Sequence, residues 1–150
     1  MRNFRKNAKI GAIVLVAALI VAQAIRIDKT NPPARSEISA DPAVKPILKR
    51  ACYDCHSNET VWPWYSNVAP VSWLIGSDVN EGRSKMNFSE WGKYSSKDQA
   101  DKLKEIVEEV QTGGMPPWYY SLMHRNSRLS QRERDQIKNW TDIAAEKIPD

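Results

Sequence analysis

Two cysteines and a histidine are grouped in the short run Cys52-Tyr53-Asp54-Cys55-His56, and these are the only cysteines in the chain. On a helical turn, thiols three positions apart can each form a thioether with one vinyl group of a single porphyrin. The histidine that follows then lies beneath the iron as its proximal ligand. The spacing therefore predicts one covalently attached haem c, with Cys52 and Cys55 as the thioether anchors and His56 on the iron.

Other chemistries use the same cysteine spacing, and the rest of the chain argues against each of them. A closed zinc site needs two further good ligands, but there is no third cysteine and only His124 remains among the histidines. A thioredoxin-like redox pair needs a βαβ context, which the sequence lacks. Cysteines this close together cannot join distant parts of a fold as a disulfide framework does. We therefore expect haem and no zinc.

The charge of the chain is concentrated at its N-terminus. There are 22 Lys and Arg against 18 Asp and Glu, a formal net charge of +4. Arg2, Arg5, Lys6 and Lys9 supply the whole surplus, so residues 11–150 are formally neutral. No basic tract with interleaved aromatic residues remains to bind phosphates. The composition disfavours a nucleic-acid partner, and the length fits one haem domain.

An uncharged and almost wholly apolar stretch follows the basic head, so we interpret residues 1–27 as a signal or membrane-anchor segment. Ala22-Gln23-Ala24 fits signal cleavage after Ala24, which would leave a soluble periplasmic protein. We favour the alternative, an uncleaved apolar helix that reaches Ile27 and could just span a bilayer with Arg26 snorkelling. The N-terminal cations would hold that end in the cytoplasm, which places the haem domain in the periplasm, at a bacterial cytoplasmic membrane.

The remainder divides into an extended linker over residues 28–40 and a haem-binding domain over residues 41–150. The periodicity of apolar residues and the capping residues predict four helices, and no segment alternates as a strand does, so we expect an all-α fold. The helices are expected from Asp41 to the first cysteine, with a kink or late start at Pro46; from Pro70 to Met86; from Ser96, which opens a capping box, to Gly113; and from Ser130, which opens another.

Several further runs, in this order along the chain, resemble those of a known family. They are Cys52–Thr60, Trp62-Pro63-Trp64-Tyr65, Ala69–Trp73, Asn87-Phe88-Ser89-Glu90-Trp91 and Met115-Pro116-Pro117-Trp118. Together they look like the bacterial haem-binding domain family of exported, cytochrome-c-like proteins, and more distantly like a small class I type cytochrome c. The resemblance covers roughly Asp41 to Glu146. It implies a cytochrome-c-like helical domain around one covalent haem.

The same resemblance makes Met115 the distal iron ligand. Two glycines before it let the chain turn tightly, and two prolines after it limit the freedom of the loop. His124 is the main rival for the distal position, and Met86 and Met123 are weaker ones. Among the six tryptophans, packing is the default role, as for Trp140 on the last helix, while tryptophans near the ligand motifs could wall the porphyrin; these are Trp62, Trp64 and Trp118.

These expectations converge on a membrane-tethered periplasmic c-type cytochrome that passes single electrons between other exported redox proteins. A thioether opposite an imidazole favours ferrous iron and raises the potential, which suits electron transfer. The alternative is a haem-based sensor or a module that binds diatomic ligands, with an open or labile sixth position. We do not expect an enzyme, because the chain has no second C-x-x-C-H and no distal acid–base arrangement; a peroxidase-like activity is the nearest alternative of that class.

Overall fold

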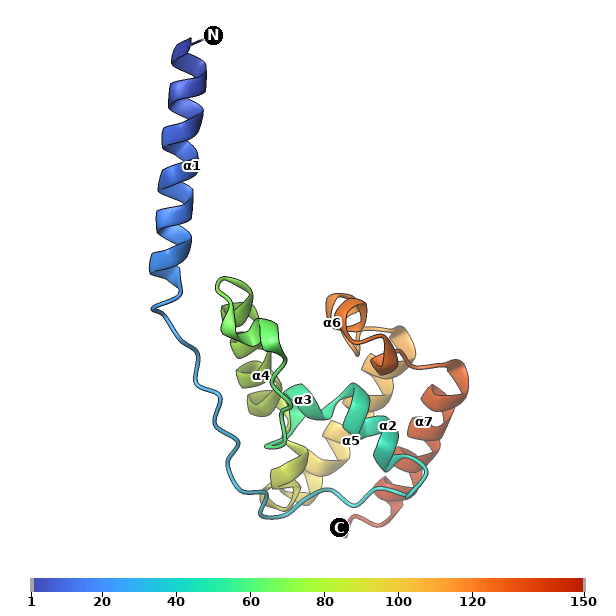
Figure 1. The fold of residues 1–150 in the computed structure, drawn as a ribbon. Helices are drawn as coiled ribbons and strands as arrows, with labels where there is room; N and C mark the ends of the chain where they lie inside the picture. The colour runs from blue at the N-terminus through green and yellow to red at the C-terminus, as the bar shows by residue number, and fades with distance from the viewer. Residues whose placement is uncertain (1, 150) are drawn as a thin grey trace. The chain divides into compact units, whose positions relative to one another are not determined.

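A computed structural model describes residues 2–149 and divides the chain into two compact units. The first is formed by the chain up to Thr30 together with Trp62–Asp78, and the second by Asn31–Val61 together with the chain from Val79 onward. Every regular element among the described residues is helical (Figure 1), which confirms the all-α prediction. Seven α-helices and three short 3₁₀ turns make up these elements.

The α-helices are α1 (Arg2–Ala22), α2 (Lys45–Ala51), α3 (Tyr53–His56), α4 (Val71–Lys85), α5 (Ser96–Thr112), α6 (Trp118–Met123) and α7 (Gln131–Glu146), and the 3₁₀ turns are η1 (Trp64–Asn67), η2 (Phe88–Lys93) and η3 (Arg125–Ser127). The late start expected at Pro46 is confirmed, because α2 begins at Lys45 with proline in its first turn. Four elements, α6, η1, η2 and η3, were not predicted. The capping box at Ser130 is confirmed, with its side chain accepting from Glu133 N–H.

The predicted membrane-spanning helix is not found. Instead of reaching Ile27, α1 ends at Ala22. The chain turns at Gln23, whose side-chain amide accepts a hydrogen bond from Ala69 N–H at 2.9 Å and donates one to the Ala69 carbonyl at 3.2 Å. Within residues 2–149, none of the helices has the combination of length and apolar character that crossing a bilayer requires.

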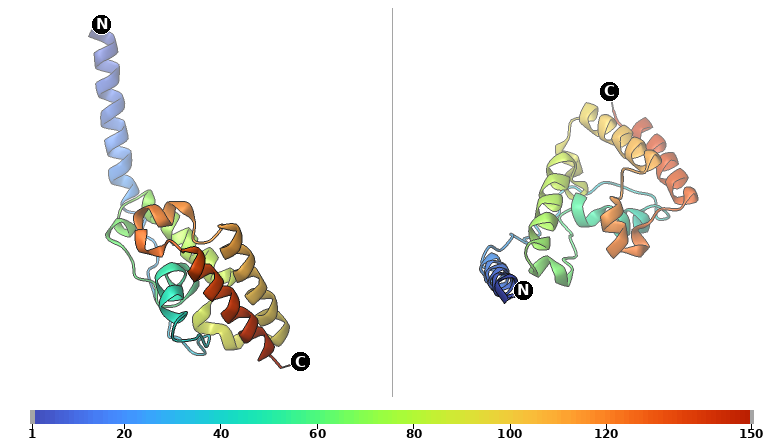
Figure 2. Two further views of the ribbon diagram at one scale, coloured as in Figure 1. Left: turned by 90° about the vertical axis from the view of Figure 1, so that its right-hand side faces the viewer. Right: turned by 90° about the horizontal axis from the view of Figure 1, so that it is seen from above.

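The second unit is built around one apolar core. α5 and α7 lie side by side in all views of Figures 1 and 2, and they bury apolar stripes that include Leu103 and Ile106 on α5 and Ile137 and Trp140 on α7. These residues have the helical spacing expected of a core-facing stripe. The core continues into the short helices that carry the cysteine motif, through Leu48, Ala51 and Tyr53, and into η2 through Phe88 and Trp91.

The segment read as a linker forms no helix, and its C-terminal part lies against this core. The N–H groups of Arg35 and Ser36 donate to the carbonyl of Ser89, and Ile38 N–H donates to the carbonyl of Phe88 at 2.8 Å. Ile38 itself is buried. These contacts hold the chain just before α2 and so help to fix the position of the cysteine motif.

Candidate haem-binding site

The cysteine motif forms a short helix with its histidine at the last position. α2 and α3 are separated at Cys52, whose φ of −127° and ψ of −35° interrupt the helix, and α3 then carries Cys55 and His56. The His56 Nδ1 atom lies 3.1 Å from the carbonyl oxygen of Met86, just beyond the end of α4. Because a carbonyl can only accept, Nδ1 carries the proton, and the lone pair of Nε2 is left to bind a metal.

The surroundings of His56 favour its neutral form. Burial lowers the pKa of the imidazole below its usual range, and the charge of Lys85 acts in the same direction; hydrogen bonding to the backbone at Met86 and Gly82 opposes the shift without reversing it. A neutral imidazole is the form that binds iron. The histidine is therefore both oriented and in the right protonation state for ligation.

The two thiols are reduced, half-buried and not joined by a disulfide. Burial, reinforced by the neighbouring Cys55, raises the pKa of the Cys52 thiol to about 12. Cys55 lies directly against α4: a Cβ atom placed on Gly82 would sit 2.6 Å from the Cys55 carbonyl oxygen. The motif is thus a packed part of the second unit, and the raised pKa keeps Cys52 in its thiol form.

A cavity of about 480 Å³ opens beside this motif. Its lining residues are Ala51, Cys52, His56, Lys85, Met86, Phe88, Lys102, Glu105, Ile106, Glu109, Val110 and Met115. The structure therefore brings three of the four predicted haem-binding residues, Cys52, His56 and Met115, to one cavity, and Cys55 is not among the lining residues. Phe88, Ile106 and Val110 give the cavity apolar walls, as a porphyrin requires.

Met115 reaches the cavity from the turn that ends α5. Gly113 adopts the left-handed conformation, with φ of 81°, that caps many helices. The N–H of Met115 then donates to the carbonyl of Glu109 at 3.0 Å, which folds the loop back onto the last turn of α5. Met86 lines the same cavity, so a second thioether is present there.

The other predicted candidates lie elsewhere. His124 stacks on Tyr120, with ring centroids 4.4 Å apart and an angle of 11° between the rings, and it does not line the cavity. Trp64 and Trp118 are exposed, and neither lines the cavity. Trp140 is buried on α7, and its indole N–H donates to the Ser39 carbonyl.

Sequence reasoning missed the polar residues that fix the chain after His56. Asn58 N–H donates to the Ser89 hydroxyl at 2.9 Å, and the side chain of Asn87 donates to that of Asn58 at 2.8 Å. The Asn87 side-chain oxygen in turn accepts from Ser89 N–H. All three side chains are buried. The sequence did contain a signal for them: Asn58 lies in the run Cys52–Thr60, and Asn87 and Ser89 lie in the run Asn87–Trp91. The structure shows that these two runs form one hydrogen-bond network.

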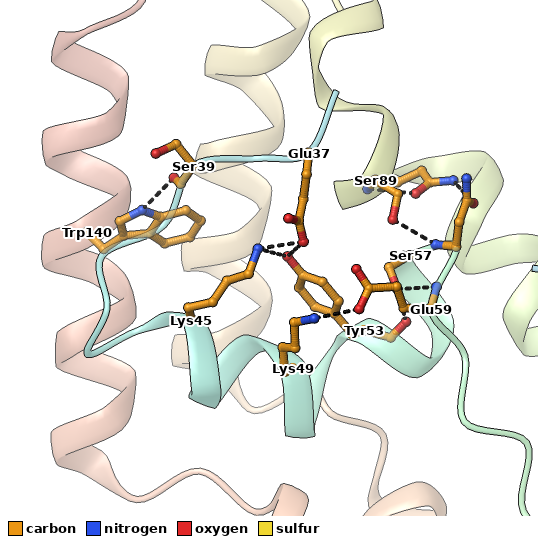
Figure 3. Close-up of polar contacts among 11 residues, drawn as sticks. Glu37, Ser39, Lys45, Lys49, Tyr53, Ser57, Glu59, Ser89 and Trp140 are labelled. Atoms are coloured by element: carbon orange, nitrogen blue, oxygen red, sulfur yellow. Dashed lines mark hydrogen bonds and ion pairs between the residues drawn. The ribbon is translucent and has the colours of Figure 1, made fainter. Parts of the chain in front are cut away.

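Tyr53, between the two cysteines, was also not predicted to matter. Its buried ring stacks on Phe88 at 5.2 Å, and its hydroxyl donates to Glu37 at 2.9 Å and accepts from Lys45 at 2.8 Å (Figure 3). Burial and the hydrogen bond to Glu37 raise the pKa of the Tyr53 phenol, so it stays protonated. Lys45 also pairs with Glu37 at 2.5 Å. Through the Tyr53–Glu37 hydrogen bond, this cluster connects the cysteine motif to the segment that precedes α2.

The donor set fits a haem. A neutral imidazole with a free Nε2, the thioethers of Met86 and Met115 and the apolar side chains of the same cavity are groups that can bind an iron porphyrin. Searches of curated proteins and of solved structures gave no match. A sequence model of the haem-binding domain family, in contrast, matches residues 17–143, most of the chain. The chain therefore belongs to the haem-binding domain family, and haem is its cofactor.

Proposed function

We propose that this protein is a c-type electron carrier, with haem c bound by thioethers to Cys52 and Cys55 and with His56 and Met115 as axial ligands. The observation that carries the proposal is the single cavity on which His56 and Met115 both open. When bound, the haem supplies an iron that alternates between the ferric and ferrous states. The protein's own contribution to electron transfer is to hold the two axial ligands in place.

The ligand environment supports a carrier in preference to a catalyst. His56 has its tautomer fixed by Met86, and Met115 is held by Gly113 and by the bond to Glu109. An imidazole and a thioether in the two axial positions would leave none for a substrate, and ligands held by these contacts would rearrange less when the charge of the iron changes. A thioether opposite imidazole also raises the potential. The partners that fit are other exported redox proteins that exchange one electron at a time.

We also propose that the haem-bearing part of the chain is exported. The support is the order of segments at the N-terminus, where Arg2, Arg5, Lys6 and Lys9 precede an uncharged apolar run. Fractionation of cells would test this: haem-containing protein outside the cytoplasm is expected, and its presence only in the cytoplasm would refute export. The mass of the purified protein would also show whether the chain is cleaved after Ala24.

Absorption spectroscopy of the purified protein tests the ligands. We expect a low-spin, six-coordinate haem, with a sulfur-to-iron charge-transfer band at the red end of the ferric spectrum. Met115→Ala should abolish that band. Met123→Ala is the matched control, because Met123 is 59% exposed on α6 and does not line the cavity. A band that survives Met115→Ala but is lost in Met86→Ala would show that Met86, the other methionine of the cavity, is the distal ligand.

Covalent attachment has its own measurement. Denatured wild-type protein should keep its haem, with a mass raised by one haem, whereas the variant in which both Cys52 and Cys55 are replaced by alanine should lose it on denaturation. A high-spin spectrum and rapid carbon monoxide binding by the unmodified ferrous protein would favour the ligand-binding alternative over the carrier.

A further inference from the structure

One hydrogen bond connects the two parts of the chain that carry the proposed axial ligands. The Tyr120 hydroxyl on α6 donates to the Asp54 carboxylate at 2.7 Å, and this contact is partly buried. Asp54 lies inside the cysteine motif, directly before Cys55 and His56, while α6 begins three residues after Met115. The bond therefore joins the segment that follows the distal ligand to the helix that carries the proximal one.

The acceptor of this bond cannot swing freely. The other oxygen of the Asp54 carboxylate accepts from Val61 N–H at 3.0 Å, and the backbone carbonyl of Asp54 accepts from the Thr60 hydroxyl at 2.7 Å. On the donor side, the Tyr120 ring stacks on His124, the residue that follows α6. Because Asp54 is fixed by two further hydrogen bonds, the bond from Tyr120 helps to define where α6 lies relative to the motif.

Most other α6 side chains contribute little packing. Trp118 is 77% exposed and Leu122 is 58% exposed, and Tyr119 and Met123 are exposed as well. Ser121 is the one buried residue of this helix and contacts Ser127, which belongs to the turn after α6 and not to the motif. Since the exposed side chains of α6 bury little apolar surface, a hydrogen bond to a charged acceptor is expected to contribute to its attachment, beside the hydrogen bond from Arg50 of α2 to the Asn126 carbonyl in η3.

We propose that the Tyr120–Asp54 hydrogen bond is a latch that keeps the Met115 loop closed over the haem cavity, and that Tyr120 is thereby a positioning residue for the distal ligand. The inference rests on the proposed function for the identity of that ligand. It explains how a loop bounded by Gly113 and Pro117 can present one thioether reliably. When this hydrogen bond is broken, Met115 can leave the sixth position of the iron, and an external ligand can bind there.

The test is Tyr120→Phe, which removes only the hydroxyl and keeps the ring that stacks on His124. Leu122→Ala is the control on the same helix, since its side chain is 58% exposed. Imidazole, added to the ferric haem protein, is the probe that competes for the sixth position. A hydrogen bond to a charged group predicts about 10- to 100-fold tighter imidazole binding in Tyr120→Phe. Leu122→Ala should match the wild type.

A second readout does not depend on which residue binds the iron. Amide hydrogen exchange of residues 115–123 should be faster in Tyr120→Phe than in Leu122→Ala, because the segment opens more often. Unchanged imidazole affinity together with unchanged exchange would overturn the latch. If the wild-type spectrum lacks the methionine band, Met115 ligation fails, and exchange alone then decides whether the latch exists. Asp54→Asn, which keeps an oxygen acceptor, should weaken the latch less than Tyr120→Phe does.

Discussion

Gly82 lies against the backbone of Cys55, so closely that a Cβ atom at position 82 would be 2.6 Å from the Cys55 carbonyl oxygen and 3.0 Å from the Cys55 Cβ atom. Real Cβ atoms do not approach other atoms so closely, and a backbone atom cannot move aside as the end of a flexible side chain can. Gly82 is buried in α4, near the Met86 carbonyl that orients His56. The absence of a side chain here therefore sets the distance between α4 and the haem-attachment helix.

Gly82→Ala should push α4 and α3 apart. We expect a net destabilisation of about 1–3 kcal/mol from overpacking, against a gain of up to about 1 kcal/mol from the better helix propensity of alanine. The same shift should disturb the His56 hydrogen bond and lower the fraction of haem-loaded protein. Urea unfolding and the ratio of haem to protein absorbance measure the two effects.

Gly11→Ala is the control for this substitution. Gly11 also lies within a helix, but nothing lies within 4 Å of a Cβ atom built there. Haem loading and the stability of the haem-bearing unit should match those of the wild type. Equal behaviour of the two variants would mean that the contact between Gly82 and Cys55 relaxes without cost.

The buried network after His56 should be costly to interrupt. Asn87→Ala removes the side-chain bonds to Asn58 and to Ser89 N–H, and it leaves their buried partners unsatisfied. The expected loss is about 1–3 kcal/mol in the free energy of unfolding. Asn80→Ala, at an exposed position of α4, is the matched control and should change stability by less than about 0.5 kcal/mol. A similar loss in both variants would count against the network.

The parts of the fold that sequence could predict are those with local signals. The helical periods of α4, α5 and α7, the glycine that ends α5 and the Ser130 capping box depend on residues a few positions apart, and the structure confirms them. The C-x-x-C-H motif is local for the same reason. By contrast, α6 has too few residues to show a helical period, although the prolines before it are a common signal of a helix start.

Long-range contacts explain what sequence could not predict. Tyr120 and Asp54 are 66 residues apart, and Trp140 and Ser39 are 101 residues apart. Neither pair has a pattern that marks it, because a single hydrogen bond leaves no periodicity. Gly82 likewise looks like any helical glycine until the fold brings Cys55 against it. The residues proposed to bind haem could be predicted from their chemistry. The residues that hold them in position could be identified only from the structure.

The start of α5 allows a sharp test of one corrected boundary. The sequence predicted that Ser96 opens the capping box, but Ser95 is the cap: its side chain accepts from Asp98 N–H and also donates to the Asp98 carboxylate at 2.7 Å. Ser95→Ala should therefore cost about 1 kcal/mol. Ser96→Ala, inside the first turn, should be neutral or slightly stabilising, because alanine is the better helix former. Urea unfolding of both variants measures the two changes in stability. A larger loss in Ser96→Ala than in Ser95→Ala would show that Ser96 is the capping residue after all.

Glu133 should make stability depend on pH. The backbone N–H and hydroxyl of Ser130, together with Arg50, hold the pKa of this carboxyl below its usual 4.5, although burial opposes them. Because the pKa is lower in the folded than in the unfolded state, the carboxylate stabilises the protein above about pH 4.5. That contribution is lost as the pH falls through the folded-state pKa.

Glu133→Gln keeps a capping side chain but cannot titrate. The variant should be less stable than the wild type at neutral pH, and the difference should shrink as the pH falls below 4.5, the usual value for the carboxyl. Urea unfolding at a series of pH values measures this convergence. Two curves that stay parallel through the acid range would show that Glu133 contributes no proton-linked stability, and the capping box would then act through geometry alone.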